Sequence, residues 1–557
     1  MAPPHTYAPP LAKATSEWTR ILGESHVRRD RGSADGTLGH TFPNDARIAV
    51  ELLPGTVTEV QECVRIAAGH GIPLYTVSTA RNWGYGTLPR GHGDCVVLRL
   101  SRLDRIREHD PELGTVSLEP GVSQGQLAAF LRAEGDRYWL DVTGSSPECS
   151  VLANYIERGF GHSPYADHFA HVCSLEVVTA DGELLQTGFG RFDNARAKNA
   201  YRWGVGPYLD GLFSQSNLGI VTGMTVWLMP KPEYFQYFHV TVAQEDDLHG
   251  CVTALRELRR RGFVQSAVHI GNAYKIYSAL NATFPWQETA GRTPLPREYV
   301  DRFLERSGGG PWSFSGGLYG TRAQVALARR EIRRTLRGKV QVRQLRFLDE
   351  RRLALMERLA GPLTLLSRTP VGRITELLRA LMGIKTGVPT DAMLKSLYWR
   401  QAEGLPREPD PDRDRCGLLW CAPVAPLKGS DAIQLNTIVK EVFDRHGFEP
   451  MISMTVISER ALDCIVALHY DRAVPGEDDR ALTCHRELLD ALTNAGYYPY
   501  RLGSHDMDPI DRKSAAAWNR VITRLGQALD PQGILAPGRY RPERSQCEPN
   551  RNGAEET

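Results

Sequence analysis

The sequence T-V-S-T-A-R-N-W-G-Y-G-T-L-P-R, residues 76–90, is a run of small residues and glycines between two apolar stretches. Residues 72–79 enter it with a β-strand pattern, and residues 95–100 (C-V-V-L-R-L) leave it with another. Glycines permit positive φ and remove the Cβ that would block a ligand, and successive backbone N–H groups then form an anion-binding nest. The segment contains neither a G-x-x-x-x-G-K-[ST] loop nor a helix-opening G-x-G-x-x-G. Taken alone it also fits an ordinary turn between two strands.

Length and composition exclude several classes of protein. A chain of 557 residues exceeds one ordinary core, so we expect two or more domains. The content of 41% hydrophobic and 24% charged residues is typical of a globular protein, and a net charge of +2 indicates no nucleic-acid and no membrane partner. The Pro-rich start (M-A-P-P-H-T-Y-A-P-P) lacks an apolar signal core, which favours a frayed tail on a cytoplasmic protein. Ten cysteines without a C-x-x-C pair predict reduced thiols and no metal site.

Several long segments, in order, resemble the vanillyl-alcohol oxidase and 4-cresol dehydrogenase family of FAD-linked flavoproteins. R-N-W-G-Y-G (residues 81–86) is similar to the family's pyrophosphate loop, and residues 53–74 are similar to the helix and strand before it. The likeness continues in R-G-F-G-H-S-P-Y-A-D-H (residues 158–168) and in G-P-Y-L-D-G-L-F-S-Q-S-N-L-G-I-V-T (residues 206–222). It returns near the end in D-P-Q-G-I-L-A-P-G-R (residues 530–539).

The resemblance implies an α+β fold with two domains. A β-turn-β pyrophosphate loop belongs to the FAD-binding domain, and the cap domain is an antiparallel sheet flanked by helices. We expect an N-terminal arm at residues 1–45, the FAD-binding domain at 46–235, the cap at 236–498, a return to the FAD-binding domain at 499–544 and a disordered tail at 545–557.

The family holds its phenolic substrate as a phenolate between two tyrosines and an arginine. These positions correspond here to Tyr85, Tyr500 and Arg501, which we predict to be catalytic. An arginine remains charged and two phenol groups add hydrogen bonds, so the trio suits an oxyanion. Seen without the resemblance, the same residues also fit a structural tyrosine and a surface arginine.

The matched motifs also predict contacts to FAD, many of them through backbone. They are Ser78, Thr79, Ala80, Arg81, Asn82, Gly84, Gly86, Pro147, Glu148, Ser150, Asn154, Gly161, Asp167, His168, Gly219, Ile220, Val221 and Arg539. In the cap, Glu459, Asp463 and His469 are candidates for polar groups of the substrate cavity, with solvent-facing side chains as the alternative.

The sequence departs from the family pattern in two places. No acid stands where the oxidase branch has its catalytic aspartate after L-D-V (residues 140–142), and Glu148 is the nearest; the 4-cresol dehydrogenase branch lacks that aspartate too. The flavin tether, a histidine or tyrosine in the family, corresponds to Leu418 or Leu419 in C-G-L-L-W-C-A-P-V. We therefore predict non-covalent FAD, with Cys416 and Cys421 as rival tethers.

Three functions remain open at this point. The first is an FAD-dependent oxidoreductase that transfers hydride from a para-substituted phenol, or a similar acidic enol, to the flavin. The second is an FAD-containing cyclase acting without net redox on an acidic enol such as a tetronate in natural-product biosynthesis. A non-catalytic binding protein is a third. The Arg-, Ala- and Gly-rich composition suits a high-GC bacterial genome, in which such scaffolds can serve secondary metabolism. The electron acceptor is either O2 or a redox protein, and we expect a homo-oligomer.

Overall fold

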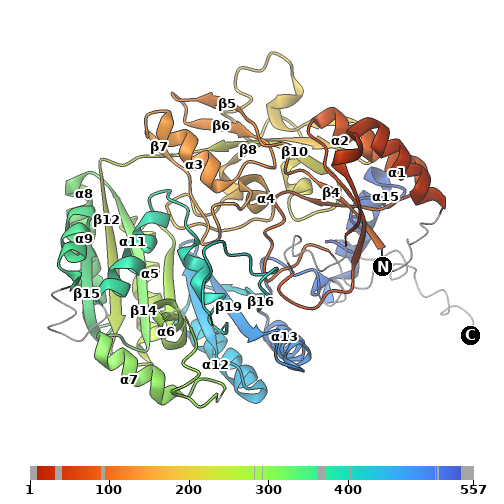
Figure 1. Ribbon diagram of the computed structural model, residues 1–557. Coiled ribbons are helices and arrows are strands. Elements are labelled where there is room, and N and C mark those ends of the chain that lie inside the picture. The colour runs from red at the N-terminus through yellow and green to blue at the C-terminus, as the bar shows by residue number, and fades with distance from the viewer. Residues whose placement is uncertain are drawn as a thin grey trace, which may run out of the picture.

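A computed structural model describes residues 9–31, 40–88, 94–281, 283–291, 293–361, 371–401, 403–507, 510 and 513–540. The chain forms two domains, drawn one above the other in Figure 1. Within the described part no helix is long and apolar enough to cross a bilayer. The tail predicted at 545–557 lies outside the described residues, as do residues 1–8.

The first domain contains two larger sheets and a two-stranded sheet of β7 (Tyr138–Trp139) and β11 (Met229–Pro230). One has the order β1-β2-β4-β3, from Val27–Arg31, Arg47–Leu52, Asp94–Arg99 and Leu74–Val77, and β4 pairs in parallel with both β2 and β3. The other has the order β5-β6-β10-β8-β9, from Ile106–Asp110, Thr115–Leu118, Ile220–Trp227, Val172–Val178 and Leu184–Gln186. The α-helices of this domain are α1 (Pro9–Leu22), α2 (Val57–His70), α3 (Gln124–Ala133), α4 (Val151–Ile156) and, from the C-terminal return, α15 (Ala516–Leu529). The loop after β3 is the glycine-bearing segment from which the sequence argument began.

Local signals in the sequence explain several of these elements. The Thr56 hydroxyl accepts a hydrogen bond from the Glu59 N–H at 3.1 Å and so caps α2. The Asp181-Gly182 turn joins β8 to β9, with Gly182 at φ 79°. Near the end of the chain, the Ala536 N–H donates to the Leu74 carbonyl at 2.9 Å. The C-terminal segment therefore contacts the strand that leads into the loop.

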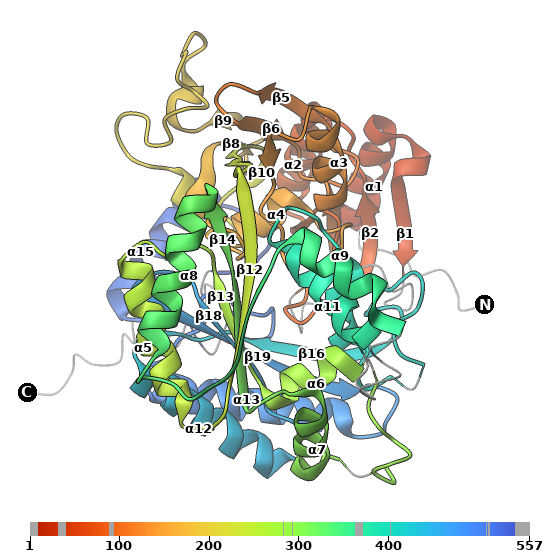
Figure 2. The same ribbon diagram turned by 90° about the vertical axis from the view of Figure 1, so that its left-hand side faces the viewer.

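The cap domain is built on one antiparallel sheet. Its main order is β15-β12-β14-β13-β18-β19-β16, and β17 (Val424–Pro426) pairs with β19. The seven strands span Val342–Leu348, Tyr234–Val242, Trp312–Gly320, Val268–Asn272, Met451–Val456, Ala461–Asp471 and Cys416–Cys421. Helices α5 (Asp247–Arg260) and α8 (Arg322–Leu336) lie on one side of β12, β13 and β14, and α11 (Val371–Ile384) lies on the other (Figure 2). Helices α12 (Gly429–His446) and α13 (Glu477–Asn494) extend the first layer, and α6 (Ala273–Asn281) lies against β13, β14 and β18.

Strand alternation gives the cap sheet two unlike faces. On β12, Phe238, Val240 and Val242 belong to the large core beneath α5, α8, α12 and α13. The intervening Tyr237 and His239 point to the opposite side and line a cavity. The sheet therefore closes a hydrophobic core with one face and presents polar side chains to the first domain with the other. The predicted α+β architecture with an antiparallel cap sheet is confirmed.

Candidate active site

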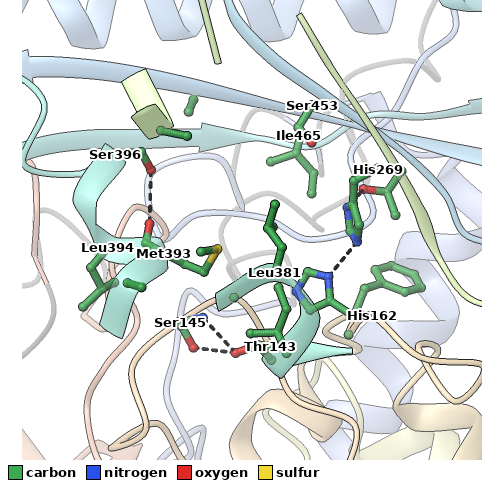
Figure 3. Close-up of a pocket in the computed structure, with 18 of the residues that line it drawn as sticks. Thr143, Ser145, His162, His269, Leu381, Met393, Leu394, Ser396, Ser453 and Ile465 are labelled. Atoms are coloured by element: carbon green, nitrogen blue, oxygen red, sulfur yellow. Dashed lines mark hydrogen bonds between the residues drawn. The ribbon is translucent and has the colours of Figure 1, made fainter. Parts of the chain in front are cut away.

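A cavity of about 630 Å³ lies between the two domains. The loop after β3 and the start of α4 line it from the first domain, and the polar face of the cap sheet, α6 and α11 line it from the cap. Figure 3 shows part of the lining, including Thr143, Ser145, His162 and His269. All three residues of the predicted trio line this cavity.

The loop fits an anionic cofactor. Within the described part of the chain, the backbone N–H groups of residues 78–82 donate no hydrogen bond to the protein. Ala80 is in the left-handed region at φ 59°, which turns successive amides in one direction. Thr79 accepts from the Ser150 N–H at 3.2 Å, which holds the loop against α4. Unpaired backbone N–H groups at a cavity wall are suited to the diphosphate of FAD.

The trio is assembled from segments more than 400 residues apart. Tyr85 and Tyr500 lie close enough for each to shift the pKa of the other. The Arg501 guanidinium carbon lies 4.6 Å from the centre of the Tyr85 ring, and its Nη2 donates to Asn82 Oδ1 at 2.7 Å. Two phenols and a guanidinium thus converge on one end of the cavity, as the resemblance implied.

Glu157, at the end of α4, fixes the arginine and was not predicted. Its carboxylate lies 3.5 Å from Arg501 Nε and 3.1 Å from Arg539 Nη2, and it accepts from the Tyr540 hydroxyl at 2.7 Å. Burial would raise the pKa of Glu157, but Arg501 and Arg539 hold it below its ordinary value. No local motif marks this role, because its partners lie more than 300 residues further along the chain.

Burial has the largest effect on the pKa values of Tyr85 and Tyr500. It raises the pKa of Tyr85 and of Tyr500 well above the ordinary value, although Arg501 opposes the shift in both. Both tyrosines therefore remain neutral hydrogen-bond donors at physiological pH, and the arginine provides the only positive charge of the trio.

The three cap candidates have different environments. Glu459 is paired with the exposed Arg460 and does not line the cavity. Asp463 and His469 are fully or almost fully buried on β19, and neither has a side-chain hydrogen-bond partner among the described residues. Asp463 lies close enough to raise the pKa of both Tyr85 and Tyr500. His469 lies beside Trp420, with ring centres 6.4 Å apart.

Of the predicted FAD contacts, some line the cavity and others do not. The lining residues are Ser78, Thr79, Ala80, Arg81, Asn82, Ser150, Asn154, Gly161 and Arg539. Gly84 packs against the cap, since a Cβ would lie 2.0 Å from Trp420 Cδ1, and Gly86 packs against Phe42 and Ser504. Asp167 is exposed, and His168 is buried in a stack with Tyr155 at 4.3 Å. Pro147, Glu148, Gly219, Ile220 and Val221 are not part of the lining.

Strand β16 carries the segment where a tether was expected. Leu418 and Leu419 are buried in the hydrophobic clusters on the two sides of the sheet, and Trp420 lines the cavity. Cys416 and Cys421 are buried away from the lining, whereas Cys149 lies in it. Sequence reasoning missed Cys149 because it concentrated on the cap domain.

Sequence reasoning also missed the histidines and the lysine that line the cavity from the first domain and from the cap. His162 Nδ1 lies 2.7 Å from His269 Nε2, and His269 Nδ1 lies 3.0 Å from Thr455 Oγ1 (Figure 3). Burial lowers the pKa of His269 to about 3, so the ring is neutral. Lys385 follows α11; its side chain is almost fully buried, and its Nζ has no hydrogen-bond partner in the described part of the chain. Burial lowers its pKa to about 8, against the opposing effect of Asp141.

Asp463 makes the stability of the protein depend on pH. Burial raises its pKa well above the ordinary 3.8, so the folded state keeps the proton that the unfolded state releases above pH 3.8. The free energy of unfolding therefore falls as pH rises from 3.8. We expect Asp463→Asn to be more stable than the wild type at pH 7 and this advantage to shrink towards pH 4. Denaturant unfolding at several pH values measures the difference in free energy of unfolding between the variant and the wild type. A difference that is the same at pH 4 and pH 7 would contradict a raised pKa for Asp463.

Comparisons with known proteins agree with this geometry. A family model described as an FAD binding domain matches residues 48–188. The chain is 40% identical over 538 residues to the 1'-carboxy-chondrochloren decarboxylase of Chondromyces crocatus, covering 95% of this chain and 97% of that protein. It is 30% identical over 485 residues to the 4-cresol dehydrogenase [hydroxylating] flavoprotein subunit of Pseudomonas putida, covering 87% and 86%.

A solved structure is similar over the whole fold. The 4-ethylphenol oxidase from Gulosibacter chungangensis, in its isoeugenol complex, matches with a TM-score of 0.86 and 31% identity, covering 98% of this chain and 100% of that chain. The matches to the dehydrogenase subunit and to the oxidase structure extend over both domains, and together with the family model they support FAD as the cofactor. The chain therefore belongs to the vanillyl-alcohol oxidase and 4-cresol dehydrogenase family of FAD-linked flavoproteins.

Proposed function

We propose that this protein is an FAD-dependent oxidoreductase that oxidises a para-substituted phenol at its benzylic carbon. The observation that carries the proposal is the convergence of Tyr85, Tyr500 and Arg501 on one end of the cavity. A buried guanidinium beside two neutral phenol groups stabilises a substrate oxyanion much more than water does. The names of the 4-cresol and 4-ethylphenol relatives support a phenol as the substrate.

The protein contributes binding, ionisation and orientation. Arg501 lowers the pKa of the bound phenol, and the tyrosine hydroxyls donate hydrogen bonds to its oxygen. The phenolate pushes electron density towards the para carbon, so loss of hydride from the benzylic position gives a neutral quinone methide. Residues 78–82, Ser150 and Asn154 would hold FAD, which supplies the hydride acceptor. No carboxylate base is needed in this scheme, because the substrate reacts as its anion.

Replacement of Arg501 tests the oxyanion site. We expect Arg501→Ala to lower kcat/KM for 4-ethylphenol by roughly tens- to hundreds-fold, the equivalent of about 2–4 kcal/mol, because the buried oxyanion loses its charge partner. Arg330→Ala, an exposed arginine on α8, is the matched control. Binding of 4-ethylanisole, which cannot ionise, should change much less than binding of 4-ethylphenol. Anaerobic bleaching of the flavin by 4-alkylphenols reports the reaction, and turnover with the flavin still oxidised would favour the cyclase instead.

We further propose that the flavin is bound without a covalent bond. Trp420 occupies the cavity-facing position of β16, and neither it nor the flanking leucines can act as the histidine or tyrosine tether. Acid precipitation of the purified protein should leave a colourless pellet and a yellow supernatant. A yellow pellet would contradict the proposal; the Cys149→Ala variant would then ask whether the cavity-lining thiol is the attachment point.

A second candidate adds loss of CO2 to the same oxidation. Lys385 is a buried ammonium without a hydrogen-bond partner among the described residues, and it lines the cavity. An unpaired buried cation is costly, which favours a ligand carboxylate beside it. If the carbon next to the benzylic position bears that carboxylate, the electron pair of its C–CO2 bond forms an alkene from the quinone methide, restores the phenolate and releases CO2. The name of the Chondromyces relative supports this variant of the reaction.

Charge selectivity tests the role of Lys385. We expect wild-type protein to bind 3-(4-hydroxyphenyl)propanoate more tightly than its neutral amide. In Lys385→Met the ratio of the two dissociation constants should fall by about 10- to 100-fold, which corresponds to the loss of one charged hydrogen bond. Lys395→Met is the matched control, because Lys395 also lines the cavity but is paired with Glu376. Dissociation constants from flavin absorption changes provide the measurement. An equal preference in Lys385→Met and the wild type would exclude Lys385 as the carboxylate partner.

A further inference from the structure

The cavity extends far beyond a simple phenol. It is lined by residues from all seven strands of the main order, from β15 through β12, β14, β13, β18 and β19 to β16. Neighbouring strands lie about 4.8 Å apart, so the five steps from β19 to β15 span roughly 24 Å. The phenol-binding trio is at the β19 end, beside Asp463. The part of the cavity that lies along the cap sheet therefore extends well beyond the reacting carbon, apart from the part lined by residues 78–82, Ser150 and Asn154 that would hold FAD.

A single row of polar side chains runs along this distance. Strand pairing places six residues directly opposite one another, in the order Arg346, His239, Ser315, His269, Thr455 and Asp463. The first five line the cavity, and their neighbours in the sequence pack largely into the hydrophobic core on the opposite face. The row begins at the exposed Arg346 and ends at the fully buried Asp463. It thus leads from the protein surface to the phenol site.

The opposite wall of the cavity is apolar. Helix α11 contributes Ile374, Leu377, Leu378, Leu381 and Ile384 to the lining. These residues recur at helical spacing, so one face of α11 lies over the cavity. Leu381 is drawn in Figure 3 with His162 and His269. The passage is therefore amphipathic, with hydroxyl and imidazole groups on the sheet side and aliphatic side chains on the helix side.

We propose that this passage binds an extended amphiphilic chain on the para substituent of the substrate. The proposal rests on the proposed function, because it takes the phenol as the end that lies against Tyr85 and Arg501. From His269 on β13 to the outer strand β15 there are three strand steps, through β14 and β12, which amount to about 14 Å. That is the length of about four extended residues, or a dozen chain atoms. Oxygen or nitrogen atoms along one side of the chain keep the polar row hydrogen-bonded, since an all-carbon chain would bury these groups unpaired.

Chain length is the direct test. N-acetyltyramine and N-decanoyltyramine carry the same phenol and the same amide, and their dissociation constants from the holoenzyme are measured by flavin absorption. Each methylene moved out of water strengthens binding roughly fourfold when fully buried, so we expect at least about 100-fold tighter binding of the decanoyl compound. A 4-alkylphenol of equal length should bind more weakly than N-decanoyltyramine. A decanoyl compound that binds within threefold of the acetyl compound would overturn the proposal.

Two variants test whether the chain binds in this passage. Ser315→Phe fills the polar row, and Leu381→Trp fills the opposite wall from α11. Each should reduce the ratio of acetyl to decanoyl dissociation constants to less than about 10, whereas Leu327→Phe, on the exposed side of α8, should leave it unchanged. If both filled variants keep the wild-type ratio, the passage does not hold the chain. If no phenol reduces the flavin but the ratio behaves as expected, the passage stands and the proposed oxidation fails.

Discussion

The buried positive charge of Arg501 is the constraint on which the site depends. An isolated guanidinium in a cavity wall is unfavourable, and here Glu157 and the Tyr85 ring lie against it while Asn82 accepts one of its hydrogen bonds. These partners come from the loop after β3 and from the end of α4, whereas Arg501 itself follows the cap domain. One charge thus ties together three segments that are distant in sequence, and the same contacts orient it towards the position of a phenol oxygen.

The cap sheet forms the rest of the cavity wall, because its two faces are chemically different. Its even-numbered residues on β12, β18 and β19 pack beneath four helices, and the odd-numbered residues face the cavity. The register of the antiparallel strands then places polar residues beside one another although they have no regular spacing in the sequence. Ser315, for example, lies opposite both His239 and His269. The geometry of the cavity follows from strand pairing, so its length is set by the number of strands in the sheet.

The parts of the fold that depend on local sequence could be predicted. The cap of α2 at Thr56, the turn at Asp181-Gly182 and the loop at residues 76–90 are short-range signals, and the trio was located because long motifs surround its members. Glu157, Cys149 and Lys385 were not found, since their roles arise from partners hundreds of residues away or from burial without a partner. Glu459 and Asp463 looked equally plausible in the sequence, but Glu459 precedes β19 and pairs with Arg460, whereas Asp463 lies on the strand and is fully buried.

The charges of the cavity also explain why the missing oxidase aspartate is compatible with redox chemistry. Glu157 lies against two arginines, Asp463 is held in its protonated form by burial, and burial keeps His269 neutral. Arg501 and Lys385 therefore face a cavity in which no described acid opposes them at close range except Glu157 and Asp141. Such a positive field favours ionised substrates, and a phenol bound as its anion already has the electron density that a base would otherwise have to provide. The chemistry then depends on selective binding of an anion, which places the discrimination between substrates in Tyr85, Tyr500 and Arg501 rather than in a proton-abstracting side chain.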